Sequence, residues 1–167
     1  MSEPTVFVVD TDTASDDAVA LAMALRYPEV RVAGITTVAG NCSVDQATNN
    51  ALLTAELCGS DVPVFAGADR PLHVEAEFAT WFHGDDGLGD RGYAPTTRRA
   101  EETDGIDALI ELVVAHPGCV LVTLGPLTNV ALALRRRPDI VASVSRCVVM
   151  GGTANSVGNV TPAAEFN

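Results

Sequence analysis

The sequence predicts an α/β fold, a mainly parallel sheet with helices on both faces. Short apolar runs rich in valine and isoleucine alternate with longer helical patterns, which is the order of βαβ units. The apolar runs are nearly continuous, as is typical of strands that are buried on both faces. The chain has 167 residues, of which 47% are hydrophobic and 19% charged. We therefore expect one globular domain, residues 1–167.

Each expected element has a local signal in the sequence. Pro28 stops the first helix, and Ser43 can cap the second, which Gly59 follows. Asp104 can cap the third helix, which Pro117 ends. The expected order is strand 6–10, helix 16–26, strand 30–38, helix 43–58, strand 62–66, helix 106–115, strand 120–124, helix 127–137 and strand 147–150.

Residues 67–102 break this alternation, because they contain no clear strand or long helix. The segment holds Trp81 and Phe82 and then the glycine-rich, acidic run at 83–90. A long irregular stretch inside a compact domain is usually functional or disordered. The aromatic residues and the glycine turns favour a binding loop, so we expect residues 67–102 to form an active-site loop region.

Four carboxylates follow the first strand: Asp10, Asp12, Asp16 and Asp17. Acids this close repel one another unless a cation lies among them, and carboxylate oxygens suit Ca²⁺ or Mg²⁺. The helix dipole accounts for Asp16 and Asp17 at a helix start, but not for Asp10 and Asp12. Ligands of parallel α/β sheets bind outside the carboxyl ends of the strands. The cluster therefore predicts a metal or catalytic site.

Other polar groups follow later strands and would share the same rim of a parallel sheet. Asn41 follows the second strand, Gly125 the fourth, and the polar segment 151–167 the fifth. Taken singly, these residues are ordinary, because turns commonly use them. Asn129, for example, is expected to be a helix-surface amide. Their convergence on one rim is the stronger observation.

Composition argues against several classes of partner and site. A net charge of −12 argues against nucleic acid and anionic membranes, which need basic surfaces. No apolar run approaches the roughly 20 residues of a membrane helix, and no basic signal-peptide region opens the chain. We therefore expect a cytoplasmic location.

The four cysteines are widely spaced, with no CxxC pair, which argues against a zinc site. In a reducing compartment we expect them to be free thiols. Cys58, Cys119 and Cys147 stand in apolar stretches and are expected to be buried. Cys42 lies near the predicted site and is expected to be more exposed.

Three known sequence motifs can be compared with the strand and acid cluster at residues 6–17. An EF-hand loop fails, because Leu21 stands at its final acidic position. No G-x-G-x-x-G loop follows the first strand. The signature of haloacid-dehalogenase-like phosphatases also starts as strand-Asp-x-Asp, although Ala14 stands where Thr or Val is usual. In that alternative, a Mg²⁺-dependent phosphatase, Asp10 would be the nucleophile and Asp12 the acid/base.

Residues 8–25, with the core DTDTASDD, resemble the N-terminal signature of the nucleoside hydrolase family of the inosine-uridine-preferring type. Further segments resemble family motifs in the same order along the chain. The fold implied is the Rossmann-like nucleoside hydrolase fold. These segments are GITTVAGN at 34–41, HGDDGLG at 83–89, LGPLTN at 124–129, VMGG at 149–152, GN at 158–159 and EFN at 165–167.

The resemblance implies hydrolysis of the N-glycosidic bond of ribonucleosides, with Ca²⁺ holding a water and the ribose diol. Asp12 would bind Ca²⁺ and act as the general base on that water. Asp17 and the carbonyl oxygen of Leu124 would be further ligands, and Asp10 a supporting acid behind them. His83 would be a catalytic residue near the base. The implied ribose-binding residues are Asp16, Asn41, Asn159, Glu165 and Asn167.

Chains of the family continue past the position of Asn167, and their later part supplies another calcium-binding Asp and, in many members, a His. We therefore expect an N-terminal part of a nucleoside hydrolase, with a sheet that is incomplete at its C-terminus and little or no activity alone. Expected partners are a ribonucleoside and either further copies of the chain or a complementing C-terminal half. The base preference stays open. So does a third function, a non-catalytic ribose- or nucleoside-binding module.

Overall fold

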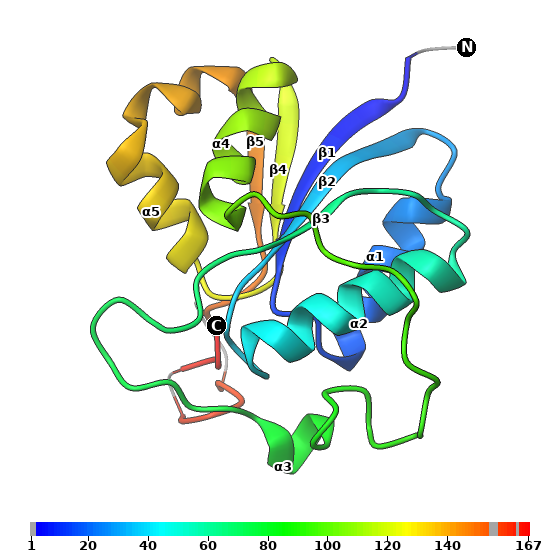
Figure 1. Cartoon of the computed structure of the whole chain (residues 1–167). Helices are drawn as coiled ribbons and strands as arrows, with labels where there is room; N and C mark the ends of the chain where they lie inside the picture. The colour runs from blue at the N-terminus through cyan, green and yellow to red at the C-terminus, as the bar shows by residue number, and fades with distance from the viewer. Residues whose placement is uncertain (1–2, 154–156, 163) are drawn as a thin grey trace.

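The computed structural model describes residues 3–153, 157–162 and 164–167. Within them, five strands form one parallel sheet in the order β3-β2-β1-β4-β5 (Figure 1). This arrangement confirms the predicted fold class. The elements are β1 (Thr5–Thr11), α1 (Ser15–Arg26), β2 (Val30–Thr37), α2 (Val44–Leu57), β3 (Val64–Ala66), α3 (Thr80–His83), α4 (Gly105–Ala115), β4 (Cys119–Thr123), α5 (Thr128–Arg136), the 3-10 helix η1 (Pro138–Ser143) and β5 (Val144–Val149).

Every predicted strand and helix is present, with its ends displaced by at most three residues. The largest change is in β5, which begins at Val144 because Val144 pairs with Cys119 of β4. The 3-10 helix η1 was not predicted; it starts at Pro138 and buries Ile140 in the core. No helix of the described residues is long and apolar enough to cross a membrane.

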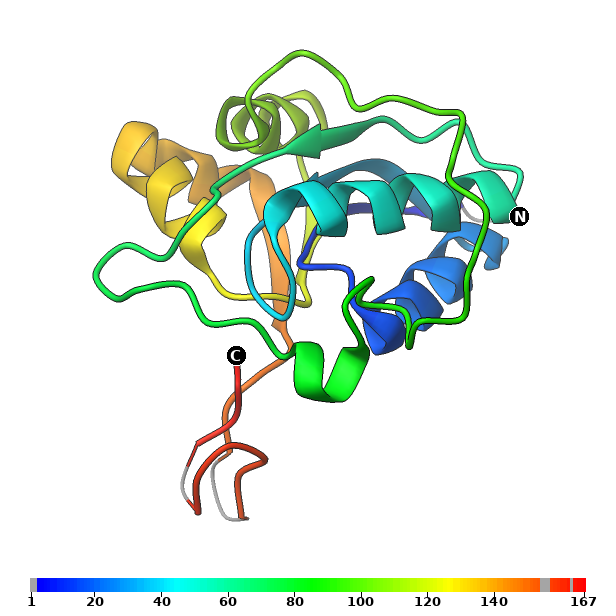
Figure 2. The same ribbon diagram turned by 60° about the horizontal axis from the view of Figure 1, so that its bottom comes forward.

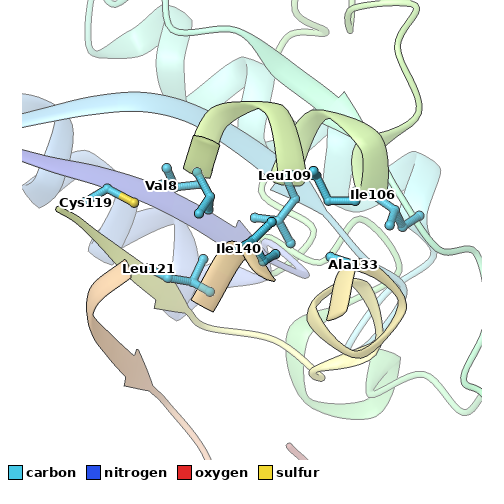
Figure 3. Close-up of a cluster of buried hydrophobic side chains, with 9 residues drawn as sticks. Val8, Ile106, Leu109, Cys119, Leu121, Ala133 and Ile140 are labelled. Atoms are coloured by element: carbon cyan, nitrogen blue, oxygen red, sulfur yellow. The ribbon is translucent and has the colours of Figure 1, made fainter. Parts of the chain in front are cut away.

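Helices cover both faces of the sheet, as the apolar strands predict (Figure 1). Successive residues of a strand point to opposite faces, so Val8 and Val9 of β1 enter different cores. Val9 packs with α1 and α2 residues such as Leu21 and Leu52. Val8 packs with α4, α5 and η1, where Leu109 is a central residue (Figure 3). The two cores leave the carboxyl ends of the strands free for polar side chains.

The predicted caps of two helices are present. The Ser43 hydroxyl accepts a hydrogen bond from the backbone N–H of Gln46 at the start of α2. The Asp104 carboxylate accepts from the N–H groups of Ile106 and Asp107 at the start of α4. Each cap satisfies backbone donors that have no partner inside the helix.

The irregular segment 67–102 contains no strand and only the four-residue helix α3, as predicted. Figure 2 shows that α3 and the C-terminal segment both lie toward the ends of the strands. The side chain of Asn50 attaches this segment to α2, because its amide donates a hydrogen bond to the Asp86 carbonyl over 2.9 Å. Residues distant in sequence thus reach the rim where the acid cluster was predicted.

The cysteine predictions are partly wrong. Cys119 is buried as expected, but Cys147 is exposed because it lies on β5 at the edge of the sheet, and Cys58 is half-buried. Cys42 is buried rather than exposed: its thiol donates to the Asp12 carbonyl over 3.2 Å, behind the acid cluster. All four are free thiols, as predicted.

Candidate active site

Three of the four predicted acids are buried at the end of β1. Asp10, Asp12 and Asp17 are 0%, 0% and 2% exposed, whereas Asp16 is exposed on the next face of α1. The ion pairs of the described residues lie elsewhere, on the surface, so no Lys or Arg neutralises this group. Buried carboxylates without a counter-charge are energetically unfavourable unless they are protonated or meet a cation.

Asp12 follows the end of β1 and contacts the segments that follow the neighbouring strands. Its Oδ2 accepts a hydrogen bond from the backbone N–H of Asn41 over 2.5 Å, whereas its buried Oδ1 has no hydrogen-bond partner. The carboxylate fits because Gly40 and Gly125 have no side chains: a Cβ at either position would overlap it. Three chain segments therefore close around one carboxylate and leave one of its oxygens free.

Asp17 lies beside Asp12 and shares its electrostatic environment. The Thr11 hydroxyl donates to Oδ2 of Asp17 over 2.5 Å. Burial, and then the charge of Asp12, raise the pKa of Asp17 to about 8. Burial also raises the pKa of Asp12 above its usual range. Two buried carboxylates and an unpartnered oxygen make a hard oxygen donor set, which fits a divalent cation such as Ca²⁺.

Asp10 lies behind these two acids. Its Oδ1 accepts from the Thr36 hydroxyl over 2.5 Å and from the Asn129 amide over 2.8 Å, and its Oδ2 is buried without a partner. Burial raises the pKa of Asp10 to about 7. Asp10, like Asp12 and Asp17, does not itself line the neighbouring cavity, and its two hydrogen bonds hold it against Thr36 and Asn129.

A cavity of about 380 Å³ opens next to the acid cluster. Trp81 and Phe82 of α3 form part of its wall, with their rings packed edge to face at 5.8 Å. A site with an apolar wall and a few convergent polar groups is typical of small-molecule binding. The cavity brings together His83 and all five predicted ribose-binding residues, Asp16, Asn41, Asn159, Glu165 and Asn167.

His83 is held at the end of α3. Its Nδ1 hydrogen-bonds with the Ser15 hydroxyl over 2.9 Å, and its ring packs edge to face against Phe82 at 4.8 Å. His83 is only 7% exposed although it lines the cavity. Because Nδ1 is engaged by Ser15, the remaining nitrogen, Nε2, is the one left for a ligand.

The carbonyl oxygen of Leu124, a predicted metal ligand, faces the C-terminal segment. It accepts a hydrogen bond from the Asn167 amide over 2.8 Å. The Leu124 N–H donates to the Asp10 carbonyl over 2.8 Å, which ties the end of β4 to β1. Within the described residues, no three His, Cys, Asp or Glu side chains form a group that could hold a metal ion. The predicted ligand set needs only two such side chains and this carbonyl.

Two buried amides near the site were not recognised from the sequence. Asn129 is 0% exposed, so the expectation of a helix-surface amide is wrong; the first turn of α5 points into the rim. Asn50 is 1% exposed and donates to the Thr13 carbonyl over 3.0 Å as well as to Asp86. One signal was present: Asn50 lies three residues after Ala47 and three before Leu53, so it shares the apolar side of α2, where an amide needs a buried partner.

Fold and site define a Rossmann-like α/β protein with a buried acid cluster beside a small-molecule cavity. The family model described as inosine-uridine preferring nucleoside hydrolase matches residues 7–167. The chain belongs to this family.

Curated relatives and solved structures agree with this assignment. Uridine nucleosidase 1 of Arabidopsis thaliana is 44% identical over 163 residues, 96% of this chain and 48% of that protein. The pyrimidine-specific ribonucleoside hydrolase RihB of Escherichia coli O157:H7 (strain EC4115 / EHEC) is 40% identical over 161 residues, 96% of this chain and 51% of that protein. The structure of a plant nucleoside hydrolase, the PpNRh1 enzyme, is 39% identical and superposes with a TM-score of 0.93, over 98% of this chain and 53% of that one. The chain spans about half the length of these relatives.

Proposed function

We propose that this chain carries the cation- and ribose-binding part of a ribonucleoside hydrolase, which cleaves the N-glycosidic bond to give free base and ribose. One observation supports the proposal above others. The Asp12 carboxylate has one unpartnered oxygen, Oδ1, while its Oδ2 accepts from the N–H of Asn41, which lines the same cavity as His83 and the other predicted ribose-binding residues. Family membership supports the same reaction.

We assign the general base to Asp12. Its Oδ1 has no hydrogen-bond partner, so this oxygen is available to take a proton from the attacking water. Asp12, Asp17 and the Leu124 carbonyl would hold Ca²⁺, which supplies positive charge that makes a water easier to deprotonate. The Asn41 N–H keeps the Asp12 carboxylate oriented during proton transfer.

The cavity residues would hold the sugar and exclude water. Hydroxyl groups of a ribose suit a lining of carboxylates and amides, which accept and donate hydrogen bonds. Asp16 and Glu165 also add negative charge, which stabilises an oxocarbenium-like sugar in the transition state. The Nε2 atom of His83, held through Ser15, would contact the substrate near the base.

The ligand set described so far is small for calcium, which prefers six to eight oxygens. Two carboxylates and one carbonyl leave room for waters, for ribose hydroxyls and for at least one further protein oxygen. We propose that a second copy of the chain or a complementing C-terminal half supplies it. Relatives differ in the base for which they are named: one is a uridine nucleosidase, and a structural neighbour from Gardnerella vaginalis is a purine-preferring ribonucleoside hydrolase.

The test is release of reducing sugar from uridine, cytidine, inosine and guanosine, with Ca²⁺ and with chelator. We expect this chain alone to release little sugar, and any calcium-dependent release to fall about 10²–10⁴-fold in Asp12→Asn, because that variant lacks the base. Asp61→Asn, which removes an exposed carboxylate, is the matched control. Calcium and ribose binding are measured in parallel by calorimetry.

The other outcomes separate the alternatives. Binding of ribonucleoside without release fits both a chain that needs further ligands and the non-catalytic module; release on addition of a complementing C-terminal half supports the first, and continued absence of release supports the second. Mg²⁺-dependent release of phosphate from p-nitrophenyl phosphate, lost in Asp10→Asn, would support the phosphatase. Release that is independent of calcium, or unchanged in Asp12→Asn, contradicts the roles assigned to Asp12.

A further inference from the structure

Asn129 is the buried amide that joins the strand ends beneath the site. It stands in the first turn of α5 and is 0% exposed. Its Nδ2 donates to Oδ1 of Asp10 and to the Thr37 carbonyl, each over 2.8 Å. Its Oδ1 accepts from the Ala68 N–H over 2.9 Å. Both Nδ2 hydrogens and the oxygen are therefore used, each on a different segment of the chain.

The three partners of Asn129 belong to the ends of three adjacent strands. Asp10 lies near the end of β1, Thr37 ends β2, and Ala68 follows β3. The amide fits between them because Gly67 has no side chain: a Cβ there would lie 2.5 Å from both amide atoms. The rim is therefore built around this side chain, which enters from the helix that follows β4.

Two of these contacts lie in the chain segments that lead to Asp12 and Asn41. Asp10 precedes Asp12 by two residues, and Thr37 precedes Asn41 by four. Between them, the Val38 N–H donates to the Thr11 carbonyl over 3.0 Å, and the Asn41 N–H then reaches Oδ2 of Asp12. Asn129 thus holds both chain segments that meet at the Asp12 carboxylate.

We propose that Asn129 is a positioning residue, which sets the distance between the Asp12 carboxylate and the Asn41 backbone and so orients the carboxylate toward a divalent cation. The inference rests on the proposed function for its ligands, but the geometric part does not. Asparagine suits the position because it donates two hydrogen bonds and accepts one. An aspartate would place an acceptor against two acceptors, Asp10 and the Thr37 carbonyl.

The test compares Asn129→Asp with Val113→Ala. Val113, on α4, is 0% exposed and belongs to the core cluster on the other side of the sheet from α1 and α2, so its truncation lowers stability without touching the site. The first readout needs no ligand: hydrogen exchange of the Asn41 amide. We compare the exchange rate of the Asn41 amide with that of core amides that exchange only through global unfolding. We expect Asn129→Asp to raise this ratio at least about tenfold, and Val113→Ala to leave it unchanged.

The second readout is calcium affinity by calorimetry, with sugar release wherever the wild type shows it. Partners that orient metal ligands are typically worth 10–100-fold in affinity or activity. We expect about a tenfold loss of calcium affinity and a lower kcat in Asn129→Asp, with KM changed less than about threefold, because the ribose contacts remain. Val113→Ala should keep all three values.

Thr36→Val covers the case in which Asn129→Asp does not fold. It removes the other hydrogen bond to Oδ1 of Asp10 with little change of volume, and we expect the same changes at smaller size. If Asn41 exchange in the folded variant matches that of Val113→Ala, the inference is wrong. A wild type that binds no calcium refutes the proposed cation site, while Asn41 exchange still decides the role of Asn129.

Discussion

Replacing the buried acid Asp17 should stabilise the cation-free protein, because no positive charge in the described residues neutralises its carboxylate. We expect Asp17→Asn to raise the free energy of unfolding when a chelator is present. The raised pKa of Asp17, about 8 against 3.8, makes its ionisation at pH 9 cost the fold up to about 6 kcal/mol. Relaxation and the shared charge with Asp12 reduce this, so we expect a gain of about 1–3 kcal/mol. Asparagine can keep the hydrogen bond from Thr11 through its amide oxygen.

The effect has a definite pH dependence. Asp17 binds its proton more tightly in the folded chain than in the unfolded one, so the folded state takes up a proton between about pH 4 and pH 8. Its contribution to stability is complete below pH 4 and is lost as the pH rises through about 8, at up to about 1.4 kcal/mol per pH unit. Asp10 acts in the same direction up to about pH 7. The advantage of Asp17→Asn should therefore be small at pH 5 and largest at pH 9.

Urea denaturation followed by circular dichroism, at pH 5 and pH 9 in chelator, measures this difference. Asp61→Asn removes an equal charge from the surface and controls for the net charge of −12. With excess Ca²⁺ the order should reverse, since the wild type gains binding free energy that the variant lacks. If Asp17→Asn is no more stable than the wild type at pH 9 in chelator, the assignment of a buried, unneutralised carboxylate is wrong.

Three further predictions follow from the packing. Gly40→Ala should lower calcium affinity about tenfold in calorimetry, because its Cβ would overlap the Asp12 carboxylate. The control Gly59→Ala, whose Cβ meets open space, should leave calcium affinity unchanged. Leu109→Ala should cost about 2–4 kcal/mol in urea denaturation, since Leu109 is 1% exposed in the core. Trp81 is the single tryptophan and lines the cavity, so ribonucleoside binding should change the fluorescence; an unchanged spectrum at saturation contradicts the proposed pocket.

Much of the fold could be predicted from the sequence because its signals are local. Valine-rich runs, the caps at Ser43 and Asp104 and the breaks at Pro28 and Pro117 depend on neighbouring residues only. The acid cluster could be placed for a related reason: in a parallel sheet, residues that follow strands meet at one rim. The exception was β5, whose first three residues become strand through pairing with β4 rather than through their own pattern.

The remaining features depend on tertiary contacts that no local pattern records. Asn129 has the sequence setting of an ordinary helix residue, and only the sheet order brings Asp10 and Thr37 to it. Cys42 was predicted to be exposed because it is near the site in the sequence, but its side chain is buried behind Asp12. The exposure of Cys147 follows from the edge position of β5, which only the strand order reveals.

The buried polar side-chain atoms that lack a hydrogen-bond partner in the described residues all lie at this rim: Oδ2 of Asp10, Oδ1 of Asp12 and Oδ1 of Asn167. Each such atom costs about 1–3 kcal/mol, against a total stability of about 5–15 kcal/mol for a domain. These three atoms are close to one another because their residues all lie around Leu124. The Leu124 backbone hydrogen-bonds with Asp10 and Asn167, and the next residue, Gly125, lies beside Asp12. All three are oxygen acceptors, so a cation or a hydroxyl-rich ligand is the partner that would satisfy them together. The rim is therefore unfavourable when empty, and binding there should stabilise the fold as well as prepare the reaction.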